Sequence, residues 1–272
     1  MNPDQFRAAL AGADVLLMGV VNVTPDSFSD GGRYYHLDEA VAHGHRLVAD
    51  GADIVDVGGE STRPGAEPVP AEEEIRRVVP VVRDLRSAGI AVSIDTRHAT
   101  VAEAAVAAGA CLVNDVSGLR DPAMRAVAAQ HDVPAVAMHM PVDDPATMQQ
   151  HTDYVDVVHD VVAFLSDHAA LALSEGVPLV IVDPGIGFGK TVEQNLELVR
   201  RLDELVALGH PVLLGASRKR FIGVLTGVEQ PEQRVAGTLA VHLAGVQRGA
   251  RIIRAHDVAA HRDALTMWKH LS

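Results

Sequence analysis

The chain has 272 residues, of which 48 % are hydrophobic, and its formal net charge is −13 at pH 7. This charge argues against general binding of nucleic acid or anionic membranes, although a local cationic pocket could still hold an anionic substrate. A single cysteine, Cys111, excludes an intramolecular disulfide, and the first residues lack the basic and long apolar segments of a targeting sequence, so we expect a cytoplasmic protein.

Eight short apolar segments end abruptly in polar or charged residues. In chain order they are residues 15–22, 53–62, 90–96, 110–115, 134–140, 179–185, 211–219 and 251–257. Short runs of β-branched residues are typical of buried parallel strands, and the polar ending marks the carboxyl end of each strand. Segments with helical periodicity alternate with them, and most stop at a glycine. These segments are 37–50, 71–88, 100–108, 121–130, 154–174, 192–208, 231–248 and 257–271.

The alternation predicts the α/β class and a (β/α)8 TIM barrel that forms a single domain over residues 1–272, because such barrels take about 250 residues. Functional side chains of these barrels gather where the carboxyl ends of the strands meet. Connections between strand and helix usually take about 2–6 residues, but 22–36, 58–70 and 140–153 are longer. We expect the first two to close over a ligand, whereas the third fits surface decoration equally well.

Four acids, Asp56, Asp95, Asp115 and Asp183, lie in or directly after apolar strand segments. A buried carboxylate is costly unless it is paired, and one alone would most often be structural. Several at one rim indicate a ligand with clustered N–H donors, such as a flat heterocycle with an amino group beside a ring nitrogen. Asn114 has both a donor and an acceptor for the same ring. We therefore predict that Asp95, Asn114 and Asp183 bind a ligand.

Positive charge is concentrated late in the chain. Arg218, Lys219 and Arg220 follow the seventh predicted strand, and Arg254 and His256 follow the eighth. Barrels often bind phosphate in the connections after these two strands. Arg254 and His256 lie two residues apart in an extended segment, so both side chains can face the same way. The pattern favours a phosphate site over solvated surface charges.

Asn22 follows the first predicted strand, and its amide oxygen is a hard ligand that suits Mg²⁺. The sequence has no HExxH or paired-cysteine pattern for zinc. The segment DPGIGFGKT is not a nucleotide loop, because a Walker A motif requires glycine where Pro184 stands. The spacing of Gly185, Gly187 and Gly189 also differs from the dinucleotide fingerprint GxGxxG.

Taken together, these segments resemble dihydropteroate synthases, a family of folate-pathway enzymes. The matching motifs, in order, are NVTPDSFSDGG, DVGGESTRPGA, SIDT, NDVSG, MHM, DPGIGFGKT, SRK and RAHDV. The resemblance implies a (β/α)8 barrel, typically a homodimer, that binds Mg²⁺ and small-molecule substrates. It implies a transferase that joins 6-hydroxymethyl-7,8-dihydropterin diphosphate to 4-aminobenzoate and releases diphosphate and 7,8-dihydropteroate. Sulfonamides compete at the aminobenzoate site of this family.

The resemblance also implies a role for each matching residue. Catalysis would rest on Asn22, Lys219, Arg254 and His256, of which Asn22 would contact Mg²⁺, and Asn22, Arg254 and His256 the diphosphate. The pterin would be held by Thr62, Asp95, Asn114, Asp183 and Lys219. The aminobenzoate would be bordered by Ser61, Thr62, Arg63, Pro64, Phe188 and Ser217.

The chain departs from the family pattern in two places. Residues 141–149, PVDDPATMQ, are more acidic than the segment usual after MHM, which leaves the role of residues 141–145 open. Ala255 stands where valine is common. Neither departure removes a residue with an implied catalytic role.

The residues favour a reaction without a nucleophile from the protein, since no Cys–His or Ser–His pairing stands out. We expect dissociative substitution, in which diphosphate leaves, the pterin supports positive charge on its methylene carbon, and the amine attacks. Two alternatives stay open: a barrel that transfers methyl from methyltetrahydrofolate to a corrinoid, and a non-catalytic pterin-binding paralogue. The intact long connections and the pair Arg254 and His256 disfavour the first. The second would be expected to have a damaged connection or to lack a phosphate ligand, and the sequence shows neither.

Overall fold

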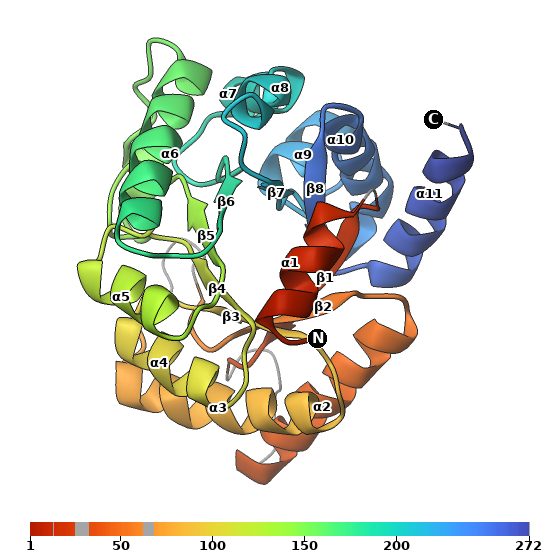
Figure 1. Ribbon diagram of the computed structural model, residues 1–272. Helices are drawn as coiled ribbons and strands as arrows, with labels where there is room; N and C mark the ends of the chain where they lie inside the picture. The colour runs from red at the N-terminus through yellow and green to blue at the C-terminus, as the bar shows by residue number, and fades with distance from the viewer. Residues whose placement is uncertain (13, 25–32, 62–67, 272) are drawn as a thin grey trace.

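The computed structural model describes residues 1–12, 14–24, 33–61 and 68–271 (Figure 1). Within them, eight parallel strands close into a barrel in chain order, with β8 paired to β1. The strands are β1 (Leu16–Asn22), β2 (Ile54–Gly58), β3 (Val92–Asp95), β4 (Leu112–Asp115), β5 (Ala135–Met138), β6 (Val180–Asp183), β7 (Val212–Leu214) and β8 (Ala250–Ala255). The predicted (β/α)8 barrel is confirmed.

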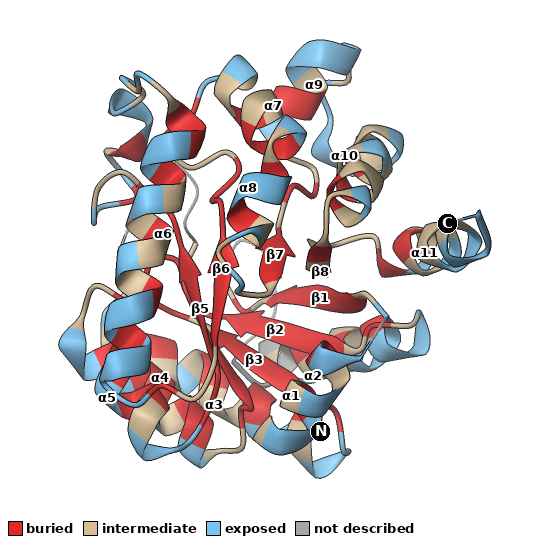
Figure 2. Cartoon of the chain, turned by 45° about the horizontal axis from the view of Figure 1, so that its top comes forward, coloured by how far each residue is buried: buried red, intermediate tan, exposed pale blue. Residues whose placement is uncertain are grey.

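Helices surround the barrel and expose their outer faces, whereas the strands are buried (Figure 2). The α-helices are α1 (Pro3–Ala11), α2 (Arg33–Ala49), α3 (Ala71–Ser87), α4 (Ala99–Ala107), α5 (Pro122–Gln130), α6 (Val157–Ser174), α7 (Val192–Arg200), α8 (Leu202–Val206), α9 (Arg220–Thr226), α10 (Val235–Gln247) and α11 (Val258–Leu271). Two single 3₁₀ turns, η2 (Met148–Gln150) and η3 (Pro231–Gln233), lie in connections.

Side chains alternate along each strand between the barrel interior and the surrounding helices, as the two-residue period of a strand requires. Leu17 and Val55 belong to the large cluster shared with the helices. Met18 and Ile54, which pair across β1 and β2, belong to a separate inner cluster. That inner cluster includes Leu112, Val136, Ile181, Leu213 and Ile252.

The next inward positions are polar. Asp56, Asn114, Asp183 and Arg254 each stand two residues beyond a member of the inner apolar cluster. The same alternation that fills the lower barrel with aliphatic side chains therefore directs these four toward the axis at the carboxyl end. The fold thus builds a polar layer on top of an apolar one.

Helix α1 was not predicted, and it closes the other end of the barrel. Its buried residues Phe6 and Leu10 join the inner apolar cluster. The sequence carried the signal: Asn2 and Gln5 form a capping box, and Pro3 occupies the first helical turn. Apolar side chains of α1 thereby close the amino-terminal end of the barrel.

Other boundaries differ from the prediction in ways the backbone explains. The predicted helix 192–208 is split into α7 and α8 at Arg201, whose φ of −112° interrupts the helix. An unpredicted helix, α9, follows β7, and α2 begins at Arg33, inside the predicted first connection. Residues 25–32 and 62–67 lie outside the described residues, so the two predicted closing loops remain predictions.

Among the described helices, α6 is long and apolar enough by composition to cross a membrane. Its buried residues Val158, Val161, Leu165, Ala169 and Ala172 recur at helical spacing and belong to the cluster between barrel and helices. The helix packs against β5 and β6. Its apolar face is therefore covered by the barrel.

Candidate functional site

A cleft opens at the carboxyl end of the barrel, and six of the predicted site residues line it together. They are Asp95, Asn114, Asp183, Phe188, Lys219 and Arg254. They come from β3, β4, β6, the connection after β6, the connection after β7, and β8. Residues 159 positions apart are neighbours here because all parallel strands end at the same rim.

Arg254 bridges two carboxylates at the bottom of the cleft. Its Nε donates to Asp56 Oδ2 at 2.6 Å, and its terminal nitrogen donates to Asp95 Oδ2 at 2.7 Å. The Asn114 amide also donates to Asp56 Oδ2, at 3.0 Å. Asp56, which sequence reasoning left without a role, is fully buried and organises this network.

The charges in this network act on one another. Burial opposes ionisation of Asp95 and raises its pKa to about 7, although Arg254 works in the other direction. Burial also disfavours the charge on Arg254, yet Asp56 and Asp95 raise the pKa of the guanidinium. Two acids and one guanidinium leave the cleft with a negative balance whenever Asp95 is ionised, which suits a ligand rich in N–H donors.

Asp183 and Lys219 also line the cleft, and their charges interact. Asp183 Oδ1 accepts from the Gly185 N–H at 2.7 Å, and burial raises the pKa of this carboxyl. Lys219 Nζ donates to the Ile186 carbonyl at 2.5 Å and lies 4.1 Å from the centre of the Phe188 ring. Burial lowers the pKa of Lys219 to about 8, opposed by Asp183.

The glycine-rich segment after β6 curls around Lys190, a residue that sequence reasoning left without a role. Its Nζ donates to the carbonyls of Gly185 and Phe188 at 3.0 and 2.9 Å and to His139 Nδ1 at 3.0 Å. Lys190 is buried, which lowers its pKa to about 7. A Cβ on Gly185 would lie 1.9 Å from the His139 carbonyl, so only glycine fits. Lys190 thereby fixes the loop that carries Phe188.

The unusually acidic third connection is folded against this loop. Asp143 pairs with Arg120 at 3.0 Å, and Asp144 accepts from the Ala146 N–H at 2.9 Å. Gln149, in η2, donates to the Gly187 carbonyl at 2.8 Å. The connection therefore supports the wall of the cleft through Gly187.

Ser217 and His256 lie at the rim, beyond the cleft lining. Ser217 Oγ accepts from the His256 N–H at 3.1 Å and lies 3.0 Å from His256 Nδ1. Asn22 ends β1 and Ser61 follows β2, and both are partly exposed at the same end of the barrel. The remaining predicted residues, Thr62, Arg63 and Pro64, lie outside the described residues.

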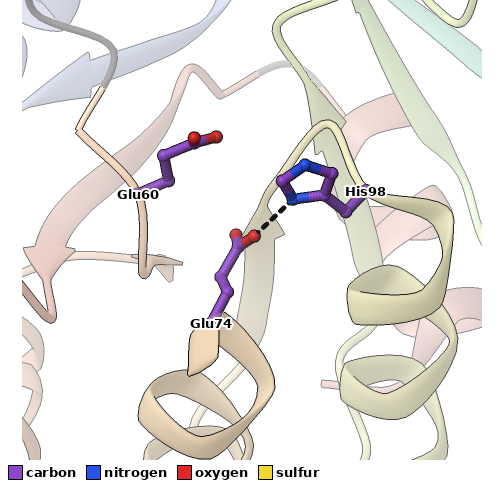
Figure 3. Close-up of side chains that lie close together, drawn as sticks. All are labelled: Glu60, Glu74 and His98. Atoms are coloured by element: carbon purple, nitrogen blue, oxygen red, sulfur yellow. Dashed lines mark hydrogen bonds and ion pairs between the residues drawn. The ribbon is translucent and has the colours of Figure 1, made fainter. Parts of the chain in front are cut away.

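Glu60, Glu74 and His98 form a cluster beside the cleft, where the ends of β2 and β3 meet α3 and α4 (Figure 3). Their ligand atoms lie within 4.8 Å of one another, close enough to hold a metal ion. His98 Nδ1 lies 2.8 Å from Glu74 Oε2. Arg97 already donates to both oxygens of Glu60, at 2.9 and 3.1 Å. A metal would compete with Arg97, and without one the cluster ties the segment after β2 to the start of α4.

Comparison with known proteins agrees with this geometry. Residues 18–256 match a family described as "Pterin binding enzyme". The chain is 48 % identical over 253 residues to a probable bifunctional folylpolyglutamate synthase/dihydropteroate synthase of Haloferax volcanii, which covers 92 % of this chain but only 30 % of that longer protein. It is 47 % identical over 247 residues to a dihydropteroate synthase of Bacillus subtilis, covering 89 % of this chain and 84 % of the relative.

The barrel also superimposes on solved structures. A dihydropteroate synthase from Thermus thermophilus, crystallised with 4-aminobenzoate, is 56 % identical and gives a TM-score of 0.88. The match covers 96 % of this chain and 95 % of that one. The described cleft is therefore set in the same framework as an enzyme known with one of its ligands bound.

Proposed function

The chain belongs to the dihydropteroate synthase family, whose members join 6-hydroxymethyl-7,8-dihydropterin diphosphate to 4-aminobenzoate, and we propose how its residues divide this work. The observation that carries the proposal is the polar layer of the cleft. Acceptors from β3, β4 and β6 face cations from the ends of β7 and β8 across one opening. A pterin with a diphosphate tail has donors at one end and negative charge at the other.

The acids of the cleft accept hydrogen bonds from the pterin. The amino group and ring N–H of a pterin are parallel donors that match a carboxylate. Asp183 and Asp95 are the cleft carboxylates, and Asn114 supplies a mixed donor and acceptor between them. Lys219, held over Phe188, donates to a ring oxygen or nitrogen. Buried polar groups left without a ligand partner are costly, so a heterocycle lacking these donors is rejected.

The diphosphate lies toward the rim of β7 and β8. Arg254 connects the two regions, since it is anchored by Asp56 inside the cleft while its strand ends next to His256. A guanidinium and an imidazole near the bridging oxygen stabilise the charge that develops as diphosphate leaves. The nearby acids Asp95 and Asp183 favour the positive charge left on the pterin methylene carbon, which supports dissociative substitution.

Mg²⁺ fits the same end of the barrel. Asn22 lies partly exposed at the end of β1, and one neutral amide oxygen combined with phosphate and water oxygens is an ordinary Mg²⁺ environment. The ion would supply charge neutralisation for the departing diphosphate. An Asn22→Ala variant should need more Mg²⁺ for half-maximal activity; an unchanged Mg²⁺ titration would contradict this assignment.

4-Aminobenzoate would approach from the side of Phe188. The Thermus thermophilus relative binds this compound, and we assign its site here to Phe188, Ser217, Ser61 and the predicted residues Thr62, Arg63 and Pro64. We further propose that residues 1–272 form one domain, and that the protein is a homodimer and cytoplasmic. The roles proposed for the cleft residues do not depend on these three points.

The deciding experiment incubates purified protein with the pterin diphosphate, labelled 4-aminobenzoate and Mg²⁺. We expect labelled 7,8-dihydropteroate and an equal amount of diphosphate. Binding of the pterin diphosphate without product would favour the non-catalytic paralogue. Methyl transfer from methyltetrahydrofolate to a corrinoid, without dihydropteroate formation, would favour the other alternative.

A further inference from the structure

Two buried histidines outside the cleft touch across α10 and α11. His242 Nδ1 lies 2.8 Å from His261 Nε2, and each side chain is 1 % exposed. At one end of the pair, the Ala216 N–H donates to His242 Nε2 at 3.0 Å. At the other end, His261 Nδ1 lies 2.7 Å from the Asp257 carbonyl. The two rings therefore connect the end of β7 with the end of β8.

The end groups fix where the protons are. A backbone N–H can only donate, so His242 Nε2 must be the unprotonated acceptor. A carbonyl can only accept, so His261 Nδ1 must carry a proton. One proton then lies between the rings, donated from His242 Nδ1 to His261 Nε2. All four ring nitrogens are satisfied only when both rings are neutral.

An additional proton has no acceptable position in this chain of hydrogen bonds. On His242 Nε2 it would face the Ala216 N–H, and on His261 Nε2 it would face the proton on His242 Nδ1. A tautomer change of His242 only moves the conflict back to Ala216. Every charged form therefore opposes two donors and breaks one of the three hydrogen bonds.

The bridge adjoins two residues with proposed roles: His256, assigned to the diphosphate, and its hydrogen-bond partner Ser217, at the border of the aminobenzoate site. Ala216 precedes Ser217, and Asp257 follows His256. Above the bridge, Ser217 and His256 are hydrogen-bonded, and the Asp257 carboxylate holds Arg218 at 2.6 and 3.0 Å. Loosening the bridge would release the backbone on both sides of these contacts.

We propose that His242 and His261 are positioning residues: a neutral imidazole bridge that holds the ends of β7 and β8 as one diphosphate-binding unit and loosens when a proton enters. The inference rests on the proposed function, because it takes the rim of these two strands as the diphosphate site. It adds two residues that touch no substrate but set the separation of those that do.

The surrounding groups keep the bridge neutral at ordinary pH. Burial lowers the pKa of His242 well below its usual value, and the neighbouring His261, His256 and Lys219 add to this effect. Burial likewise lowers the pKa of His261, opposed by Asp257, whose carboxylate is paired with Arg218. Protons therefore enter only in acid, where the folded protein binds fewer of them than the unfolded chain and loses stability as pH falls.

Histidine ¹⁵N spectra of the ligand-free wild-type protein test the bridge itself. We expect His242 and His261 to be neutral at pH 7, both with the proton on Nδ1. A proton on Nε2 of either ring, or a charged ring at this pH, would overturn the proposal. This result does not depend on which substrate the protein uses.

Variants test the positioning role. His261→Phe keeps an aromatic ring but removes both nitrogens, and His261→Gln keeps an acceptor for His242. His131→Gln, at a surface histidine that contacts Glu103, is the matched control. We expect His261→Phe to weaken binding of the pterin diphosphate about tenfold at pH 7.5, the effect of one lost buried hydrogen bond. His261→Gln should restore most of the affinity at pH 7.5. Asp95 titrates in both proteins, so the test is the additional loss of affinity in more acidic solution, which should be smaller in His261→Gln than in wild type.

The outcomes separate the two claims. A folded His261→Phe protein with wild-type affinity and wild-type pH dependence would overturn the positioning role. If His261→Phe does not fold, the pH dependence of His261→Gln decides, and a profile identical to wild type would count against the proposal. Wild-type protein that binds no pterin diphosphate at any pH would overturn the proposed function, whatever the spectra show.

Discussion

Arg254 and Asp95, 159 residues apart in sequence, form an ion pair of 2.7 Å across the cleft. Asp56 accepts from Nε of the same guanidinium at 2.6 Å. One cation therefore holds together a residue assigned to the pterin and the strand end assigned to the diphosphate. The two halves of the substrate are recognised by a single charge network, and its protonation state should control binding and stability in opposite ways.

The first prediction concerns Asp95. Burial raises its pKa to about 7, so between pH 4 and about 7 the folded protein binds more protons than the unfolded chain, and stability falls as pH rises through this window. Asp95→Asn removes the ionisation. At pH 8 we expect the Tm of Asp95→Asn to be at least that of wild type and up to a few degrees higher. Its affinity for the pterin diphosphate should fall about tenfold or more. Thermal melts at pH 5 and 8 check the first part, and a Tm well below wild type at pH 8 would contradict it.

The second prediction concerns Gly187, where the glycine loop meets Lys219. A Cβ there would lie 2.8 Å from Lys219 Cδ, and φ is +83°. Gly209 is a matched control, since its φ is +81° but a Cβ would meet nothing within 4 Å. Gly187→Ala and Gly209→Ala should both lose about 1 kcal/mol of stability to backbone strain. Only Gly187→Ala should also weaken pterin binding, and equal affinities of the two variants would contradict the packing argument.

Lys190 is the subject of the third prediction. Its ammonium group donates to two carbonyls and to His139 in a buried position. Lys190→Met removes these bonds from the Phe188 carbonyl and His139 Nδ1, whereas the Gly185 carbonyl keeps the Phe188 N–H at 3.0 Å. We expect a loss of about 2–4 kcal/mol in the free energy of unfolding and a higher KM for aminobenzoate, because Phe188 loses its fixed loop. Urea unfolding and steady-state kinetics measure the two effects. Wild-type stability in this variant would show that the loop is held by other contacts.

Much of the site was readable from the sequence because strands have a period of two and parallel strands share one rim. The period of two predicts that Asp95, Asn114 and Asp183 lie at one rim, and all three line the cleft, while their binding of a ligand stays a prediction. The sequence does not predict which of these side chains contact one another in the folded protein. Nothing local in the sequence pairs Asp56 with Arg254, since that contact depends on β8 closing the barrel between β7 and β1.

Three further features that the sequence analysis does not predict are α1, the break between α7 and α8, and the contacts of Lys190. The capping box of α1 is a local signal in the sequence, whereas the break at Arg201 follows from one backbone angle inside an otherwise continuous helical pattern. Lys190 stands in the segment DPGIGFGKT, which carries no local signal for its partners. Two of its partners are backbone carbonyls of its own loop, whose path depends on the positive φ of Gly185, Gly187 and Gly189, and the third is His139, 51 residues earlier in the chain.

The central claim is that the polar layer of the cleft holds the pterin. Equilibrium titration of the pterin diphosphate into wild type and Asp183→Asn tests it directly, with the exposed Asp167→Asn as control. We predict a Kd at least about tenfold weaker for Asp183→Asn, because the amide cannot accept two parallel N–H bonds, and an unchanged Kd for the control. Wild-type affinity in a folded Asp183→Asn protein would contradict the account.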